Sequence, residues 1–360
     1  MSERQRVLVV GCGRMGTSHA KAYSAIGDFE LVGLVDRDPG RLQALDKALG
    51  GGNALFGDLA RALEAVRPAI VAVCTLPGSH EEIAIRSLEA GAHVFLEKPI
   101  ATTVEGGRRV VDAAVKARRK LLIGYGLRHH PSWIKFIEIA RTLGKPLVMR
   151  MNLNQQTKAD VWAVAKGILE SVSPIVDCGV HYVDVMCQMT GASPVRVSAI
   201  GARLSDEVAK GMYSYGQLQV TFDDGSVGWY EAGWGPMMSE TAFFVKDVVG
   251  PRGSVSIVPR SGGAASQSSD LKAHSKADSL RIHHAELAPG GDFARPDEVL
   301  DLSDEPDHDE LCRREQRFLL KAIRENVDLT RHMNDAVNTL RIVLAADESV
   351  RTGKTVELRA

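Results

Sequence analysis

The sequence lacks several features that would point to particular classes of protein. Its formal net charge is −1, so neither a basic surface for nucleic acid nor an acidic tail is expected. No apolar run approaches the length that a membrane span requires, and no internal repeat is visible. The first predicted strand begins by Val7, which leaves no room for a signal peptide. A protein that binds neither nucleic acid nor membrane is therefore predicted.

Cysteine is scarce and dispersed along the chain. There are five cysteines, an odd number, and no two of them form a C-x-x-C pair: Cys12, Cys74, Cys178, Cys187 and Cys312. This pattern argues against a disulfide framework and against a zinc site, and it favours reduced thiols in a cytoplasmic protein. The remaining composition is that of an ordinary globular protein, with 44% hydrophobic and 25% charged residues. With 360 residues, two domains are expected.

The stretch from Val7 to Gly16 is the most informative part of the chain. An apolar strand over 7–10 runs into a Gly-x-Gly-x-x-Gly turn, and a helix over 17–26 is predicted to follow. Glycines at this spacing allow the tight turn, the approach of a pyrophosphate and close helix packing, while the helix N-terminus offers free N–H groups. The alternative is a glycine turn in an unrelated α/β protein. The candidate cofactor-binding residues here are Gly11, Gly13, Arg14, Met15 and Gly16.

A second predicted strand, over 31–36, ends at Asp36. A carboxylate about twenty residues beyond the glycines is placed to accept hydrogen bonds from the ribose hydroxyls of the adenosine half. It would also repel the 2′-phosphate of NADP, which favours NAD. The adjacent Arg37 acts in the opposite sense, because a guanidinium pairs with phosphate, so NADP remains possible.

Strands and helices alternate up to about residue 125, which predicts a parallel sheet covered on both faces. After residue 126 the pattern changes to helices over 131–143 and 174–189 and then to strands in series, with a hairpin turn at 223–226. This predicts an α/β domain over 1–125 and an α+β domain with a mostly antiparallel sheet over 126–360. The further predicted strands are 69–75, 93–97, 121–124, 147–153, 195–202, 214–222, 226–234, 241–249 and 253–258; helices are predicted from about 39, 79 and 103.

Three polar segments are interpreted without a functional role. Residues 261–270 are small and polar and predict an exposed, mobile loop. The acidic stretch 301–310 predicts a solvated turn and the first turn of a helix over 310–326, in preference to a metal site. The pair His283-His284 is expected on an edge segment, without a spaced partner, as ordinary surface.

The segment Glu97-Lys98-Pro99 ends the fourth predicted strand, at the sheet edge where parallel sheets place their active sites. The proline keeps Lys98 extended, so that its ammonium group projects from the strand tip. A lysine that merely ends a strand is the alternative.

The segment 177–184 has the sequence DCGVHYVD. In a helix, Asp177, His181 and Asp184 would share one face, and Val180 with its apolar neighbours 176, 183 and 187 would pack on the opposite face. A histidine flanked by carboxylates suits a general base, because a carboxylate fixes the tautomer and stabilises the imidazolium. A solvated polar face is the alternative.

These motifs together resemble the glucose–fructose oxidoreductase / inositol dehydrogenase (Gfo/Idh/MocA) family. The matching segments, in the family's order, are GCGRMG at 11–16, the stretch 75–103 with LEKP, RHHP at 128–131, LGKP at 143–146 and DCGVHYVD at 177–184. The resemblance implies a Rossmann domain and an open-faced sheet domain, with the chemistry between them. The C-terminal helix would pack back on the Rossmann domain.

The resemblance also implies roles for the matched residues. It makes Lys98, Asp177 and His181 the catalytic group, in contact with substrate as well, and it implies a cis bond between Lys98 and Pro99. Near the nicotinamide half it places Thr75, Leu76, Pro77, His80 and Glu97, and Lys98 is a candidate for binding the cofactor as well. The chain departs from the family before the DCGVHYVD segment and at Gly126, so the substrate is not carried over; Arg128 and Trp162 are candidates for lining its pocket.

The resulting expectation is an NAD-dependent dehydrogenase or reductase that acts on a sugar, a sugar derivative or a cyclic polyol and needs no metal. His181 would take the hydroxyl proton, Asp177 would orient the ring and Lys98 would stabilise the alkoxide. Two alternatives remain: a cofactor-bound sugar sensor or transcriptional regulator, and an NAD-dependent glycosidase that oxidises its substrate transiently.

The strand 226–234 carries aromatic residues on both of its faces. Alternation puts Val227, Trp229 and Glu231 on one face and Tyr230 and Trp234 on the other. Helices of the domain can cover one face, and another subunit is the simplest cover for the other. A homodimer or homotetramer through the C-terminal sheet is therefore expected, as the resemblance also implies.

Overall fold

The computed structural model describes residues 4–170, 172–240, 245–258, 268, 277, 279–302 and 305–358. The chain forms two compact units, one of residues 1–126 with 306–340 and the other of residues 127–305 with 341–360. The predicted loop at 261–270 lies outside the described residues except for Ser268, which is buried. None of the described helices combines the length and the apolar character that crossing a bilayer requires.

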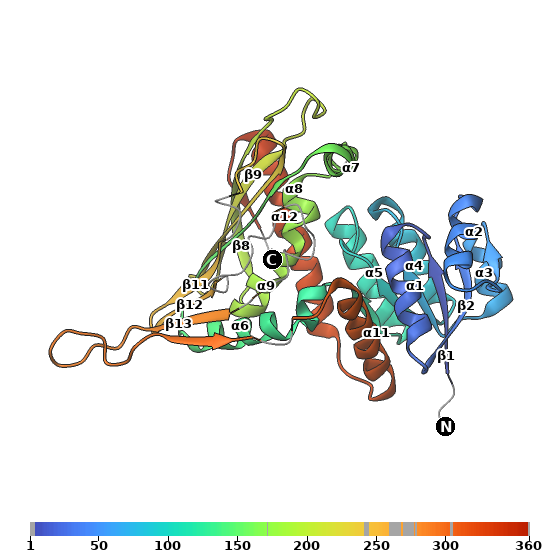
Figure 1. The fold of residues 1–360 in the computed structure, drawn as a ribbon, viewed down its shortest axis with the longest axis horizontal. Coiled ribbons are helices and arrows are strands. Elements are labelled where there is room, and N and C mark those ends of the chain that lie inside the picture. The colour runs from blue at the N-terminus through green and yellow to red at the C-terminus, as the bar shows by residue number, and fades with distance from the viewer. Residues whose placement is uncertain are drawn as a thin grey trace. The chain divides into compact units, whose positions relative to one another are not determined.

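The first unit contains a six-stranded parallel sheet in the order β3-β2-β1-β4-β5-β6, which confirms the predicted Rossmann architecture (Figure 1). Its strands are β1 (Gln5–Val10), β2 (Phe29–Val35), β3 (Leu55–Phe56), β4 (Ile70–Val73), β5 (His93–Leu96) and β6 (Leu121–Ile123). Its helices are α1 (Arg14–Ala25), α2 (Pro39–Ala48), α3 (Leu59–Val66), η1 (Pro77–Ser79), α4 (His80–Glu89), α5 (Val104–Ala117), α11 (His308–Arg324) and the first part of α12 (Thr330–Thr352).

The strand register brings the candidate cofactor residues to one edge of this sheet. Val10 pairs with Val35 on β2 and with Val73 on β4, and Leu96 pairs with Val73 and with Ile123. All these pairings are parallel, so the carboxyl ends of the strands meet at one edge. Every residue of β4 is buried, as expected for a strand covered on both faces.

Helix α11 packs against α1, so a segment from late in the chain completes the first unit (Figure 1). The helix begins after Asp307, whose carboxylate accepts a hydrogen bond from the backbone N–H of Glu310, and acidic residues occupy its first turn. The prediction of an acid-rich helix start is therefore confirmed. The helix begins two residues earlier than predicted because Asp307 caps it.

The second unit is built on a nine-stranded sheet in the order β14-β13-β12-β11-β7-β10-β9-β8-β15. Among the described strands of this sheet only β7 and β10 pair in parallel, so the predicted mostly antiparallel sheet is confirmed. Its strands are β7 (Val148–Gln156), β8 (Pro194–Ala202), β9 (Tyr215–Phe222), β10 (Val227–Gly235), β11 (Lys246–Gly250), β12 (Gly253–Val258), β13 (Ser279–His284), β14 (Glu298–Asp301) and β15 (Val356–Glu357).

Helices cover one face of this sheet. The helices of this unit are α6 (Pro131–Thr142), α7 (Ala159–Leu169), α8 (Pro174–Asp177), α9 (Gly179–Thr190) and the end of α12, and the short η2 (Gly126–His129) precedes them. Figure 1 shows α6, α8 and α9 on the same side of the sheet, and α8 and α9 pack on β10. None of the described helices covers the opposite face, so the predicted open face is present.

Three predictions for the second unit were wrong in detail. The single helix expected over 174–189 is two helices, α8 and α9, because the helix is interrupted at Cys178. Helix α7 was not predicted. The pair His283-His284 does not lie on an edge segment, because β13 runs between β12 and β14. Nor is it without partners, since Asp297 and Glu298 accept hydrogen bonds from the two rings at 2.8 and 2.7 Å.

Glu305 departs from the solvated turn that was predicted for 301–310. Its carboxylate accepts hydrogen bonds from the Ser132 hydroxyl at 2.5 Å and from the backbone N–H of Ala277 at 3.1 Å, and it lies 3.4 Å from Nε2 of the buried His130. These hydrogen bonds outweigh the opposing effect of burial and hold the pKa of Glu305 below its usual range. Glu305 therefore anchors its segment to the start of α6.

Candidate active site

The glycine turn after β1 leaves room for a ligand at one glycine only. Gly11 has a φ of +94°, and a Cβ there would lie 2.6 Å from the carbonyl oxygen of Cys74. A Cβ on Gly16 would lie 1.7 Å from the carbonyl oxygen of Gly11. At Gly13, by contrast, no heavy atom of the described chain lies within 4 Å of an added Cβ. The two outer glycines are thus required for packing, and the middle one allows a phosphate to approach the backbone.

Helix α1 begins without a neutralising group at its N-terminus. Its N-cap residue is Gly13, no described side chain caps it, and its first turn has no acidic residue. In the same unit the caps of α2, α3 and α5 are the side chains of Asp38, Asp58 and Thr103. The N–H groups and the positive dipole end of α1 therefore remain available for an anion such as a pyrophosphate.

Asp36 is fixed beside this turn, as predicted from the sequence. One carboxylate oxygen accepts a hydrogen bond from the backbone N–H of Cys12 at 2.7 Å, and the other accepts one from the N–H of Asp38 at 2.9 Å. Each oxygen keeps a further lone pair, so the carboxylate can still accept a hydrogen bond from a ribose hydroxyl. Arg37 is exposed next to it.

The loop after β4 contains four of the predicted cofactor residues. Leu76 is the most exposed of them, with 80% of its surface accessible, while Thr75 and Pro77 are half-buried. His80 is fully buried, and its ring nitrogens face the carbonyl oxygens of Pro99 and Thr75 at 2.7 and 2.9 Å. Burial lowers the pKa of His80, whereas the two carbonyls act in the opposite sense. His80 thus joins this loop to the segment after β5.

Glu97, Lys98 and Pro99 follow β5 at the same edge of the sheet. The Lys98–Pro99 bond is cis, as the resemblance implied. The buried Glu97 carboxylate accepts hydrogen bonds from Nε2 of His19 at 2.8 Å and from the backbone N–H of Lys98 at 3.2 Å. The Lys98 side chain is half-buried.

Asp177 and His181 belong to the second unit, where they flank the break between α8 and α9. Asp177 is the last residue of α8, His181 lies in the first turn of α9, and both side chains are half-buried. Behind them, Tyr182 stacks on Tyr230 of β10 with ring centroids 5.2 Å apart. Gly179 lets the helix approach that ring, because a Cβ there would lie 3.0 Å from Tyr230. The break therefore sits close against the sheet.

Helix α8 is also held from its N-terminus. Ser173 caps the helix by accepting a hydrogen bond from Val176, and its hydroxyl donates one to the carboxylate of Asp347 at 2.7 Å. The hydroxyl of Tyr213 donates to the same carboxylate oxygen at 2.5 Å. Burial raises the pKa of Asp347. This buried network, which sequence reasoning missed, ties the short helix carrying Asp177 to α12.

Arg128 and Asp184 form a bidentate ion pair. Nε and Nη2 of Arg128 donate to the two carboxylate oxygens at 2.8 and 2.6 Å, and Gln188 donates to one of them at 3.0 Å. The Asp184 side chain is 1% exposed and that of Arg128 is 14% exposed. Asp184 is therefore not part of a solvated polar face, as its spacing from His181 had left possible. The role of Arg128 in lining a substrate pocket stays a prediction.

Trp162, the other candidate for the substrate pocket, lies on α7. It is buried with Ala165, Leu169, Val208 and Trp234, and its indole N–H donates to Glu207 at 3.2 Å. Its place in an apolar cluster accounts for the burial without any ligand. Contact between Trp162 and substrate likewise stays a prediction.

The comparisons with known proteins agree with this architecture. Residues 5–125 match the model of an oxidoreductase family with an NAD-binding Rossmann fold, and residues 139–256 match the GFO/IDH/MocA C-terminal domain. The D-apiose dehydrogenase of Paraburkholderia graminis is 24% identical over 99% of this chain and 91% of its own length. The myo-inositol 2-dehydrogenase of Thermotoga maritima is 30% identical over 56% of this chain.

The match spans about 60% of the length of the Thermotoga enzyme and about 55% of the D-glucoside 3-dehydrogenase of Escherichia coli, which is 29% identical over 53% of this chain. Among solved structures, an NAD-binding oxidoreductase from Klebsiella pneumoniae has the same fold, with a TM-score of 0.80, 19% identity and 100% coverage of both chains. Because the two family models together match more than half of its residues, this chain belongs to the Gfo/Idh/MocA oxidoreductase family.

Proposed function

We propose that the protein is a dehydrogenase that transfers hydride between NAD and a secondary alcohol of a sugar, sugar derivative or cyclic polyol. The observation that supports this most strongly is the open space at Gly13, beside the uncapped N-terminus of α1 and the fixed carboxylate of Asp36. These three features fit a dinucleotide. The names of the relatives, which act on inositol, glucosides and apiose, support the substrate class.

In this proposal the protein moves a proton and stabilises charge. An alcohol releases hydride readily only while its O–H proton is being removed. His181 takes that proton, Asp177 orients the imidazole, and the Lys98 ammonium stabilises the developing alkoxide. When bound, the nicotinamide supplies the hydride acceptor. In the reverse direction the same groups deliver a proton to a ketone.

Absorbance of reduced cofactor tests the proposal directly. The protein is incubated with NAD and one candidate substrate at a time: myo-inositol, apiose or a methyl glucoside. Net formation of NADH with at least one of them is expected. Cleavage of the glycoside without formation of NADH would favour a glycosidase. If neither NADH formation nor cleavage occurs, a sensor is favoured.

The free thiols of all five cysteines support a reducing, cytoplasmic location.

NADH should bind more tightly than NADPH, by about tenfold or more, because the 2′-phosphate would meet the Asp36 carboxylate. Fluorescence titration of both reduced cofactors measures this ratio. Asp36→Ala should strengthen NADPH binding, whereas Arg37→Ala should not. Tighter binding of NADPH by the unmodified protein would refute the cofactor preference.

We further propose that the open face of the nine-stranded sheet joins two copies of the chain. Val227, Val148 and Val249 lie side by side on three adjacent strands, each 38–40% exposed, and Trp229 lies in the next row on the same face. The remainder of the face is more polar than the sequence suggested, with an Arg150–Asp247 ion pair beside Trp229. An apolar stripe within a polar surround is typical of a protein interface.

Light scattering at micromolar concentration should give two or four times the chain mass of 38.9 kDa. Val227→Glu should lower the mass toward that of one chain, because it buries an unpaired charge in the stripe. Val115→Glu is a matched control, since Val115 is 62% exposed on α5 of the other unit. A single-chain mass for the unmodified protein would refute the interface.

A further inference from the structure

A chain of buried hydrogen bonds leads from Glu97 into the body of the first unit. Nε2 of His19, on α1, lies 2.8 Å from one Glu97 oxygen, and Nδ1 of the same ring lies 3.0 Å from the amide nitrogen of Gln316 on α11. The hydroxyl of Tyr23 donates to the amide oxygen of Gln316. His19, Tyr23 and Gln316 have no accessible surface, and Glu97 is 7% exposed.

The donors and acceptors of these hydrogen bonds follow one consistent order. The Gln316 amide nitrogen can only donate, so Nδ1 of His19 must accept, and the ring proton is then on Nε2. Nε2–H in turn donates to Glu97, whose second oxygen accepts from the backbone N–H of Lys98. The His19 ring is held further by Phe95, two residues before Glu97, with centroids 4.4 Å apart. Every polar atom of the His19 ring is therefore used.

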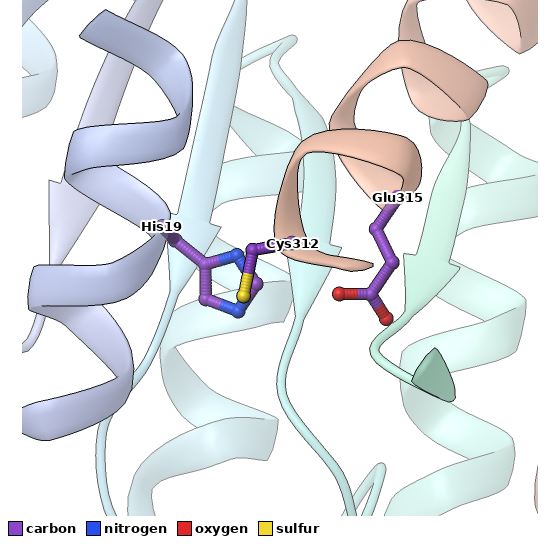
Figure 2. A group of neighbouring side chains, drawn as sticks. All are labelled: His19, Cys312 and Glu315. Atoms are coloured by element: carbon purple, nitrogen blue, oxygen red, sulfur yellow. The ribbon is translucent and has the colours of Figure 1, made fainter. Parts of the chain in front are cut away.

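A metal site is the competing interpretation of this region. Figure 2 shows His19 from α1 beside Cys312 and Glu315 from α11, and their possible ligand atoms lie within 4.8 Å of one another. Both ring nitrogens of His19, however, already have protein partners. Burial raises the pKa of Cys312 and of Glu315, which favours their protonated forms, and metals bind the deprotonated ones. The hydrogen-bonded chain accounts for His19 better.

We propose that His19 and Gln316 are positioning residues that hold the Glu97 carboxylate and, through it, the backbone from which Lys98 projects. The inference rests on the function proposed above, because Lys98 acts there on the substrate oxygen. Without the His19 donor, Glu97 would keep its place beside Glu315 but lose a hydrogen bond to its charged form. Among the described residues of this unit, the titratable side chains that interact electrostatically with Glu97 or His19 are Cys74, His80, His308, Cys312 and Glu315. Tyr23 and Lys98 adjoin the same chain of hydrogen bonds.

Two substitutions at position 19 test the proposal. His19→Gln keeps an N–H donor near the position of Nε2, whereas His19→Leu removes it at similar volume. With the substrate that the wild-type protein oxidises, His19→Leu should lower kcat at pH 7 by about ten- to a hundredfold, the loss expected for one hydrogen bond to a charged group. His19→Gln should stay within about threefold of wild type.

Equal losses in both variants, with lowered thermal stability, would show a merely structural role and overturn the proposal. Stoichiometric zinc in the wild-type protein that His19→Leu loses would assign a metal site instead. Lys98→Ala separates the two hypotheses. If it abolishes turnover while the two His19 variants behave alike, only the positioning role fails; if it retains turnover, the proposed function fails.

The tautomer of His19 can be measured without any substrate. In protein labelled with ¹⁵N-histidine, the resonances lost in His19→Gln identify His19. A protonated Nε2 and an unprotonated Nδ1 are expected in the wild-type protein, because the Glu97 carboxylate accepts from Nε2 and the Gln316 amide nitrogen donates to Nδ1. The opposite tautomer would contradict the chain of hydrogen bonds.

Discussion

Replacing Lys98 or His181 by alanine should reduce kcat by about 10²–10⁴-fold, the usual contribution of a positioned acid–base or charge-stabilising group. The two residues come from different units of the chain, Lys98 from the tip of β5 and His181 from the first turn of α9. Steady-state turnover with NAD measures the effect. Thermal melting and NADH titration should remain close to wild type, because both side chains are half-buried and at the ends of elements.

His283→Ala is the matched control for His181. His283 has a carboxylate partner, Asp297, and is 31% exposed, but it lies on β13, for which no role in catalysis is proposed. Its substitution should leave turnover unchanged. Near-normal turnover of His181→Ala at neutral pH would show that His181 is not the general base.

Breaking the Arg128–Asp184 pair should lower the free energy of unfolding by about 3–5 kcal/mol. Arg128→Met removes the cation while Asp184, 1% exposed, would remain as an uncompensated buried charge. The double variant Arg128→Met/Asp184→Leu should recover most of the loss, because no buried charge is left. Urea unfolding of the three variants measures these differences.

Arg281→Met provides the control for a surface pair in the same unit. Arg281 lies 2.7 Å from Asp297 but is 61% exposed, so its loss should cost less than about 1 kcal/mol. If Arg128→Met costs no more than Arg281→Met, the buried pair does not stabilise the second unit. If the double variant is stable but has lost substrate affinity, Arg128 also contributes to the pocket.

The sequence predicted what depends on local chemistry. The glycine turn, Asp36 and the Glu97-Lys98-Pro99 segment are each short, and strand alternation alone brings them to one sheet edge. The faces of β10 followed from alternation as well, with Tyr230 and Trp234 buried and Trp229 partly exposed. In these places a few adjacent residues determine the geometry.

What the sequence did not predict depends on contacts between distant segments. His19 contacts Glu97, which is 78 positions away in the sequence, and Gln316, which is 297 positions away. No periodicity in the sequence predicts either contact. Asp184 was spaced to share a face with His181, but a partner 56 positions away makes it a buried ion-pair residue. Local sequence predicted a single helix over 174–189, but the helix is interrupted at Cys178. Helical spacing predicts which face of a helix a charged residue lies on, but it does not predict the residue's partner in the folded protein.

The transfer of deuterium tests the central claim most directly. The protein is incubated with NAD and with myo-inositol deuterated at its hydroxyl-bearing carbons, and then with apiose and a methyl glucoside labelled in the same way. Mass spectrometry of the cofactor should find the deuterium in the reduced nicotinamide with at least one substrate, and Lys98→Ala should abolish the transfer. Reduced cofactor that carries no deuterium, or no reduced cofactor with any labelled substrate, would contradict the proposed dehydrogenase.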